Sequence, residues 1–220
     1  MIEQIEIRSL LPCVFAGMED TDRIRSSQIW EEPSFVFHRG CRLCVHAESG
    51  NGKSSLLHFI YGSRKDYKGS ILFDGTDISA LSIAQWCEVR TRGIALLPQD
   101  MALFPELTVG QNIDLKNNMT HHKSSEQIKD LLARLGIDDK HDVAAGKLSI
   151  GQMQRVALVR AVCQPFDFIF LDEPVSHLDA RNNKIVADII TEEANNQGAG
   201  IISTSVGNHL MLDNAKFVLL

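Results

Sequence analysis

The sequence predicts an α/β fold built on a mostly parallel sheet, with an N-terminal antiparallel β subdomain and a helical insertion. Short apolar runs alternate with segments that carry apolar residues at helical spacing, an order typical of parallel sheets. The run at 168–171 is continuously apolar, as expected for a strand buried on both faces. Between 99 and 147 no strong strand run occurs and the clearest segment is helical, which indicates the insertion.

The first half of the chain supplies most of the expected strands. Short runs rich in apolar or β-branched residues, bounded by turn signals, indicate strands at 3–10, 34–38, 41–46, 70–74 and 93–97. Apolar residues at helical spacing predict one helix from 54 to the stop signal Gly62 and another over 79–90. The polar and charged stretch 17–27 indicates an exposed loop.

The second half alternates helices with strands. Helices are expected at 125–135, 150–163 and 180–196, and strands at 168–171, 200–204 and 216–220. Ser124 and Gln127 have the spacing of a capping box at the start of the first of these helices. We therefore expect one domain over 1–220, with a core of 1–98 and 148–220 and a helical subdomain at 99–147.

Composition excludes several classes of protein. The chain of 220 residues is 44% hydrophobic and 23% charged, as in ordinary globular domains. Its net charge of -6 argues against a nucleic-acid partner, because such proteins usually carry a basic stripe. No apolar run approaches the roughly 20 residues of a membrane span, and the N-terminus does not resemble a signal peptide. We therefore expect a cytoplasmic protein.

The glycine-bearing loop at 47–55 is the strongest functional signal. It lies between an expected strand and a helix start, so backbone N–H groups converge on one point and favour phosphate. Lys53 would reach the β- and γ-phosphates of a nucleotide, and the Ser54 hydroxyl would hold Mg²⁺. The residues expected to contact the nucleotide here are Glu48, Ser49, Gly50, Asn51, Gly52, Lys53, Ser54 and Ser55. This context predicts a P-loop NTPase core.

The first position of the loop departs from the motif G-x-x-x-x-G-K-[ST]. Ala47 stands where the motif has glycine, and alanine does not adopt positive φ cheaply. The alternative interpretation is a chance Gly-Lys-Ser sequence in a turn.

Two carboxylates follow the buried strand at 168–171. Asp172 at the strand end is suited to holding Mg²⁺, usually through water. Glu173 would point into the site and orient or deprotonate an attacking water. The alternative is an acidic strand end that is simply exposed to solvent.

A second helix start, at 149–152, offers another place for phosphate. Ser149 can N-cap the following helix, and Gln152 completes a capping box. Gly151 leaves the backbone open for close approach, so Ser149, Gly151 and Gln152 are candidate nucleotide contacts. The alternative is a helix cap and nothing more.

Together these motifs resemble the ATP-binding cassette (ABC) ATPases over nearly the whole chain. In the family's order they are Walker A at 47–54, the Q-loop at Gln99, the LSGGQ signature at 148–152, Walker B with its glutamate at 171–174, and the D-loop at 176–179. Ile150 replaces the first glycine of the signature, and His177 stands in the D-loop where the family usually reads S-A-L-D.

The resemblance implies a two-chain mechanism. Such cassettes dimerise head to tail, with ATP between Walker A of one subunit and the signature of the other, and hydrolysis reopens the dimer. In the family Gln99 would touch Mg²⁺ or water and sense the transport partner. An aromatic residue near the N-terminus usually stacks on adenine. Phe15 is the candidate, Trp30 the rival, and either could instead belong to the core.

One departure concerns the strand that ends near residue 204. The family normally follows it with a histidine that contacts the γ-phosphate, and here that position is Ser205. Serine is shorter than histidine, and its hydroxyl would reach the phosphate through a bridging water, so we expect Ser205 to support slow hydrolysis. His209 lies four residues further on and would need a shifted loop to replace the missing histidine.

The resemblance favours the ATP-hydrolysing subunit of a membrane transporter. The expected ligands are ATP and Mg²⁺, and the expected partners are an integral membrane permease and a second ABC ATPase subunit, in a homodimer. Such a subunit lies at the inner face of the membrane, bound to the permease through the surface of 99–147. The alternatives are a soluble ABC-type ATPase of an assembly machine and a nucleotide-binding subunit with little hydrolysis.

Overall fold

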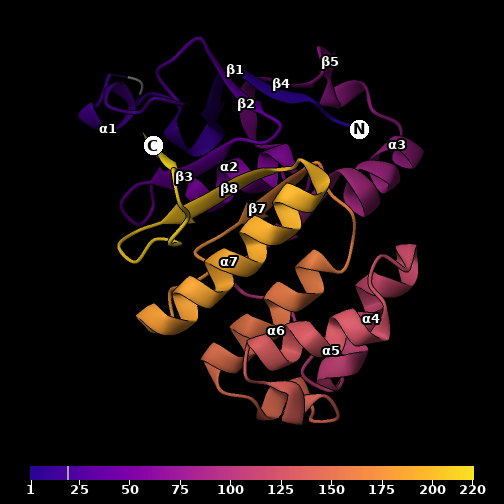
Figure 1. The fold of residues 1–220 in the computed structure, drawn as a ribbon. Coiled ribbons are helices and arrows are strands. Elements are labelled where there is room, and N and C mark those ends of the chain that lie inside the picture. The colour runs from indigo at the N-terminus through magenta and orange to yellow at the C-terminus, as the bar shows by residue number, and fades with distance from the viewer. Residues whose placement is uncertain (19) are drawn as a thin grey trace.

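Two sheets organise the chain, as the computed structural model of residues 1–18 and 20–220 shows (Figure 1). The antiparallel sheet has the order β2-β1-β4-β5, and the parallel sheet has the order β6-β7-β8-β3-β9. The predicted fold class, with its parallel core, antiparallel sheet and helical insertion, is confirmed.

The antiparallel sheet combines strands from both sides of the phosphate loop. Its members are β1 (Gln4–Pro12), β2 (Ser34–His38), β4 (Tyr67–Phe73) and β5 (Thr76–Asp77). Ile5 and Ile7 of β1 are buried on one face, which is the alternation expected of a half-buried strand. The register between β1 and β4 shifts after Arg8, next to Ser9 with its φ of 44°.

The parallel sheet brings five strand ends to one edge. It consists of β3 (Arg42–His46), β6 (Ile94–Leu97), β7 (Phe168–Leu171), β8 (Gly200–Ser205) and β9 (Lys216–Leu219). Every pairing in it is parallel. All four residues of β7 are buried, as its apolar run predicts. The loops that follow β3, β6, β7 and β8 therefore leave the same edge.

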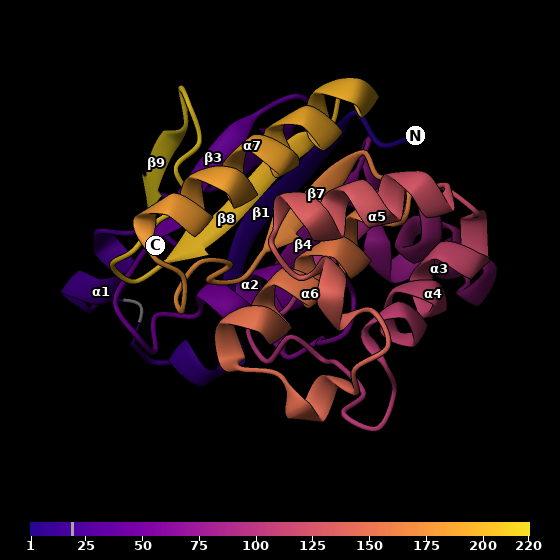
Figure 2. The same cartoon turned by 60° about the horizontal axis from the view of Figure 1, so that its bottom comes forward.

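Helices cover both faces of the parallel sheet. The α-helices are α1 (Asp22–Arg25), α2 (Lys53–Ile60), α3 (Ile83–Glu88), α4 (Val109–Thr120), α5 (Ser125–Arg134), α6 (Ile150–Val162) and α7 (Ala180–Gln197). α2 shares a core with the antiparallel sheet and with Phe168 and Phe170 of β7. Helices α4 to α7 share the other core with Ile169 and Leu171 (Figure 2). None of the described helices is long and apolar enough to cross a bilayer.

The loop expected at 17–27 is only partly a loop. Residues Asp22–Arg25 form a helical turn, and Ile24 is buried in the core beneath the antiparallel sheet. The prediction of an exposed loop is wrong there, because a single apolar residue among charged ones carries no periodicity. Glu19 lies outside the described residues.

The helix expected at 79–90 is broken. A 3₁₀ turn (Ile78–Ala80) precedes α3, and a π turn (Val89–Gly93) follows it. Ser82 accepts a hydrogen bond from the backbone of Gln85 and forms a capping box with it, so the α-helix begins only after Ser82.

Helix α4 has no counterpart among the predicted elements. Its buried face contains Asn112 and Asn117 beside Val109 and Ile113, so polar residues interrupt the apolar stripe. The Asn112 amide is satisfied by donating to the carbonyl oxygens of Phe104, Leu107 and Thr108. The signal that could have identified α4 is the capping box of Thr108 and Gln111, which the structure contains.

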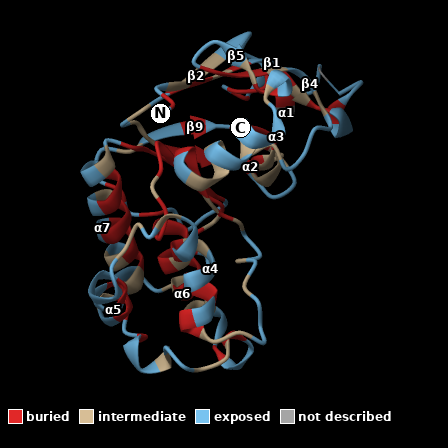
Figure 3. Cartoon of the chain, turned by 90° about the vertical axis from the view of Figure 1, so that its right-hand side faces the viewer, coloured by how far each residue is buried: buried red, intermediate tan, exposed pale blue. Residues whose placement is uncertain are grey.

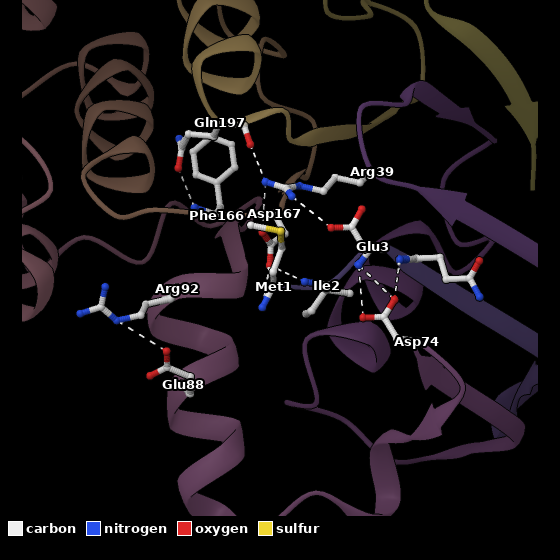
Figure 4. A network of polar contacts seen from close by, with 11 residues as sticks. Met1, Ile2, Glu3, Arg39, Asp74, Glu88, Arg92, Phe166, Asp167 and Gln197 are labelled. Carbon is white, nitrogen blue, oxygen red and sulfur yellow. Dashed lines mark hydrogen bonds and ion pairs between the residues drawn. The ribbon is translucent and has the colours of Figure 1, made fainter.

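Asp167 joins the two sheets at the edge away from the phosphate loop (Figure 4). Its buried carboxylate accepts a 2.6 Å hydrogen bond from the Ile2 amide and pairs with Arg39 at 3.5 Å. Arg39 also contacts Glu3 and the carbonyl oxygen of Gln197. One carboxylate thus connects the segment before β1, the turn after β2, and the loop before β7.

Two ion pairs attach the helical segment to α7. Lys123 contacts Glu193 at 2.6 Å with both side chains 9% exposed, and Arg134 contacts Glu192 at 2.8 Å. Figure 3 shows α4, α5 and α6 at the end of the molecule opposite the antiparallel sheet.

Candidate functional site

A hollow of about 220 Å³ lies where the phosphate loop meets the carboxyl edge of the parallel sheet. Its lining residues are Val14, Phe15, Ser49, Gly50, Gly52, Lys53, Ser54, Ser55, Gln99 and Glu173. Every one of these except Val14 was predicted as a site residue. Among the other predicted residues, Glu48, Asn51, Asp172, Ser205 and the signature residues do not line the hollow.

The backbone of the loop shows why its glycines stand where they do. Gly50 and Gly52 have φ of 85° and 93°, in the left-handed region that glycine adopts without strain. A Cβ on Gly52 would also approach Trp30 and Phe15 within 3.3–3.4 Å. Ala47 is not among the residues with positive φ, so alanine fits the first position of the motif here.

Lys53 lies at the first turn of α2 and is 5% exposed. Its ammonium group donates to the carbonyl oxygens of Ala47 at 2.9 Å and Glu48 at 3.0 Å. Burial lowers the pKa of Lys53, and the carboxylates of Glu173 and Asp172 oppose that effect. The ammonium thus faces the hollow from the loop, 4.0 Å from a Glu173 carboxylate oxygen.

Glu173 has the backbone conformation of a residue under constraint. Its φ is 48°, which is uncommon for a residue other than glycine and costs of order 1–3 kcal/mol. The surroundings hold it there, because its amide donates to the Thr204 hydroxyl and its carbonyl accepts from Gln154. The carboxylate is thereby turned toward Gln99, whose amide nitrogen lies 3.4 Å from it.

Asp172 is fixed more deeply than Glu173. Its side chain is buried and accepts a 2.6 Å hydrogen bond from the Thr204 hydroxyl, and its amide donates to Leu97 of β6. Thr204, at the end of β8, thus contacts both acidic residues. Sequence reasoning missed it, although a hydroxyl at the end of a strand beside the acidic one is the signal that could have identified it.

The predicted magnesium ligands offer oxygen donors of the kind Mg²⁺ binds. Ser54 contributes a hydroxyl at the start of α2, Asp172 a carboxylate and Gln99 an amide oxygen. These hard donors fit a magnesium ion that keeps several waters, which is its usual state in nucleotide sites.

The N-terminal turn (Cys13–Phe15) contributes Val14 and Phe15 to the lining of the hollow. Phe15, the predicted adenine-stacking residue, is 4% exposed and lies against Gly52. Trp30 is 5% exposed, and its indole nitrogen donates to the Asn51 carbonyl. Both aromatic side chains therefore pack against the phosphate loop. Val14, by contrast, is 71% exposed.

The signature segment forms the open N-terminus of α6. Ser149 and Gln152 make the expected capping box, with Ser149 accepting from the Gln152 amide at 3.3 Å. A Cβ on Gly151 would lie 3.2 Å from the His177 carbonyl oxygen, so a side chain there would crowd the D-loop. Ile150 is 51% exposed at this end of the helix.

Ser205 is the last residue of β8, one position further along the strand than predicted. Its side chain is 1% exposed, with the hydroxyl 3.3 Å from Nδ1 of His46 and 3.4 Å from Sγ of Cys44. The hydroxyl therefore faces neighbouring side chains of β3. His209 lies apart from this contact, with its ring edge-on to Phe217.

The geometry has a counterpart in known proteins. A family model described as ABC transporter matches residues 30–176, more than half of the chain. The chain belongs to the ABC transporter family. The match covers the phosphate loop, Gln99 and the acidic pair, which meet at the carboxyl edge of the sheet, and the segment 148–152 at the start of α6.

Curated ABC relatives cover most of this chain. It is 31% identical to the lipoprotein-releasing system ATP-binding protein LolD of Buchnera aphidicola over 78% of its length and 76% of that protein. It is 29% identical to the ABC transporter ATP-binding protein YtrE of Bacillus subtilis over 87% of its length and 84% of that protein. The chain is thus an ATP-binding subunit of the ABC transporter class.

Solved structures of ABC cassettes share the fold. The dimeric post-hydrolysis state of the cassette MJ0796, bound to ADP and Pi, matches with a TM-score of 0.72 and 19% identity. The match covers 93% of this chain and 88% of that one.

Proposed function

We propose that this ABC subunit binds and hydrolyses MgATP as one half of a head-to-tail dimer and so powers a membrane transporter. The observation that carries the proposal is the convergence of Lys53, Gln99 and Glu173 on one hollow beneath the phosphate loop. The similarity to ABC ATP-binding proteins such as LolD and YtrE supports the transport role.

In this proposal each side chain has one task. The loop amides and the N-terminus of α2 bind the phosphates, and Lys53 exchanges its loop carbonyls for β- and γ-phosphate oxygens. Ser54 and Asp172 would hold Mg²⁺, which would neutralise phosphate charge when bound. Glu173 orients and deprotonates the attacking water, and Gln99 contacts that water or the metal.

The second subunit supplies the other face of the nucleotide. The N-terminus of α6 is open to solvent at Ser149, and its aligned backbone amides favour an anion. This end does not line the chain's own hollow. We infer that it closes over the ATP of a partner copy, so that each nucleotide contacts both subunits.

The surface of 99–147 is the proposed contact with the permease. Three large apolar side chains are exposed there, with Phe104 at 53%, Leu115 at 47% and Met119 at 57%. Replacing all three with serine should abolish co-purification with a membrane subunit encoded beside this chain, while ATP affinity remains. Undiminished co-purification would place the contact elsewhere. Attachment there would hold this subunit at the inner face of the membrane.

Hydrolysis is expected to be slow when position 205 carries serine, because the Ser205 hydroxyl faces His46 and Cys44. A histidine at 205 that turned toward the phosphate would improve positioning, and misplacement by about 1 Å can cost roughly 10²-fold. Ser205→His should therefore raise turnover with little change in ATP affinity. A neutral or slower variant would show that serine does not limit the rate.

The test of the proposed chemistry is Glu173→Gln. Loss of the base should lower phosphate release by about 10²–10⁴-fold while calorimetry shows MgATP affinity within about threefold of the parent. Glu32→Gln, an exposed glutamate outside the hollow, is the matched control and should keep full turnover. Equal turnover in Glu173→Gln and the parent would remove Glu173 from the mechanism.

A further inference from the structure

His177 is an exposed imidazole whose orientation is fixed by its neighbours. Its Nδ1 lies 3.0 Å from the Ser176 hydroxyl, and Gln154 donates to that hydroxyl at 3.3 Å. The same Gln154 amide nitrogen donates to the Glu173 carbonyl at 3.0 Å, and its oxygen accepts from the His177 amide. A polar chain thus runs from the backbone of the catalytic glutamate to the imidazole.

These contacts allow a neutral ring that carries its proton at Nε2. The carbonyl of Glu173 can only accept and the amide of His177 can only donate, so both ends of the Gln154 amide are assigned. Ser176 accepts from Gln154 and can give its own proton to Nδ1 of His177. The N–H of the neutral ring is then at Nε2, on the side away from Ser176.

The backbone of His177 lies beside the open end of α6. The His177 carbonyl oxygen would lie 3.2 Å from a Cβ on Gly151, so the two segments are in van der Waals contact. A phosphate that approaches the N-terminus of α6 therefore approaches His177 as well. That end does not line the chain's own hollow, so in the proposed head-to-tail dimer the phosphate beside it belongs to the partner copy.

Within one chain the hollow contains no imidazole. No histidine is among the described residues that line it. The two other histidines close to the end of β8 have different contacts, since His46 faces Ser205 and His209 lies against Phe217. A hydrogen bond from a histidine to the γ-phosphate is thus not available from the same subunit in this arrangement.

We propose that Nε2–H of His177 donates a hydrogen bond to the γ-phosphate of ATP bound to the partner copy. This inference rests on the head-to-tail dimer of the proposed function. The imidazole would act in trans, in place of the histidine that position 205 lacks.

The proposed step transfers no proton through His177. The water oxygen forms a bond to the γ-phosphorus, and the bond from that phosphorus to the β,γ-bridging oxygen breaks, giving ADP and inorganic phosphate. The proton of the water goes to the Glu173 carboxylate of the subunit that holds the ATP. The imidazole N–H stabilises the charge on the γ-phosphate oxygens throughout.

Single variants give the first test. Removing a donor aimed at developing charge typically costs about 10²-fold in turnover, so His177→Ala should lose about that much with the KM for MgATP within threefold. His177→Gln retains an N–H donor and should recover part of the loss. His38→Ala, an exposed histidine on β2, should match the parent. Parent-like turnover in His177→Ala would overturn the proposal.

Mixed dimers then decide which subunit's histidine acts. A Glu173→Gln chain in tenfold excess pairs with nearly every active chain and keeps ATP bound. If that excess chain also carries His177→Ala, a native active chain should lose about 10²-fold. If the active chain alone carries His177→Ala, its turnover should stay near the parent value.

The opposite pattern, or equal rates in both mixtures, would overturn the action in trans. Sedimentation of the same mixtures with MgATP separates this failure from a failure of the proposed function. If a dimer forms and the pattern is absent, only the role of His177 falls. If no dimer forms, the head-to-tail scheme falls, and this inference with it.

Discussion

Lys53 is held by two carbonyl oxygens of its own loop, and a bound γ-phosphate would offer it a charged partner instead. A charge-assisted hydrogen bond is worth about 1.5–3 kcal/mol, which corresponds to roughly 10- to 150-fold in affinity. Lys53→Ala should weaken MgATP binding by that factor in calorimetry at fixed salt. Lys68→Ala, an exposed lysine on β4, is the control and should stay within about twofold. Unchanged affinity in Lys53→Ala would argue against the phosphate site.

At this scale the sequence could name the loop residues but not the direction of every side chain. The spacing of Gly50, Gly52 and Lys53 is a local property, and the hollow contains all three. Whether Phe15 faces the ligand or the core depends on how the N-terminal turn packs against Gly52. That contact joins residues far apart in the chain, so no local pattern reveals it.

Asn112 is the basis of a prediction about how α4 contributes to the stability of the fold. The side chain is fully buried and connects α4 to the preceding loop through Phe104, Leu107 and Thr108. Asn112→Ala would leave the Phe104 amide without the Asn112 oxygen that accepts its hydrogen bond, and an unsatisfied buried amide costs about 1–3 kcal/mol. Urea unfolding should show that loss in the free energy of unfolding. Asn118→Ala, on the exposed side of the same helix, should change it by less than about 0.5 kcal/mol. Equal effects of the two variants would contradict this role.

The same residue explains why α4 was missed when α5 was predicted. In α5 the buried residues are Ile128, Leu131 and Leu132, a continuous apolar stripe with a capping box at its start. In α4 the stripe includes Asn112, and an asparagine in the core cannot be told from an exposed one by periodicity. Element type was thus predictable wherever burial and polarity agree.

Asp167 should contribute to the stability of the whole molecule, because it connects segments of both sheets. Removing one partner of a buried pair leaves the other charge without compensation, which typically costs 3–5 kcal/mol. Arg39 keeps its contact with Glu3, so Asp167→Ala should cost about 3 kcal/mol of unfolding free energy. Asp139→Ala, an exposed acid near α5, should have little effect. A loss below 1 kcal/mol would show that this joint contributes little.

Sheet order could not be predicted from the sequence. The expected strands and their apolar character indicate a parallel core, but β3 lies between β8 and β9, which follow it by more than 150 residues. Likewise, the antiparallel sheet closes through β4, after the phosphate loop. Such pairings depend on which strands find compatible edges and faces after collapse, and short apolar runs carry too little information to specify them.

The most direct test of the central claim is sedimentation velocity of the Glu173→Gln protein with and without MgATP. This variant should bind ATP without hydrolysing it. The N-terminus of α6 in each subunit should then remain in contact with the ATP bound to the phosphate loop of the other subunit. The account predicts a monomer without nucleotide and a stable dimer with MgATP, and Lys53→Ala should abolish that dimer. A protein that stays monomeric with saturating MgATP, or forms an equally tight dimer without it, would contradict the account.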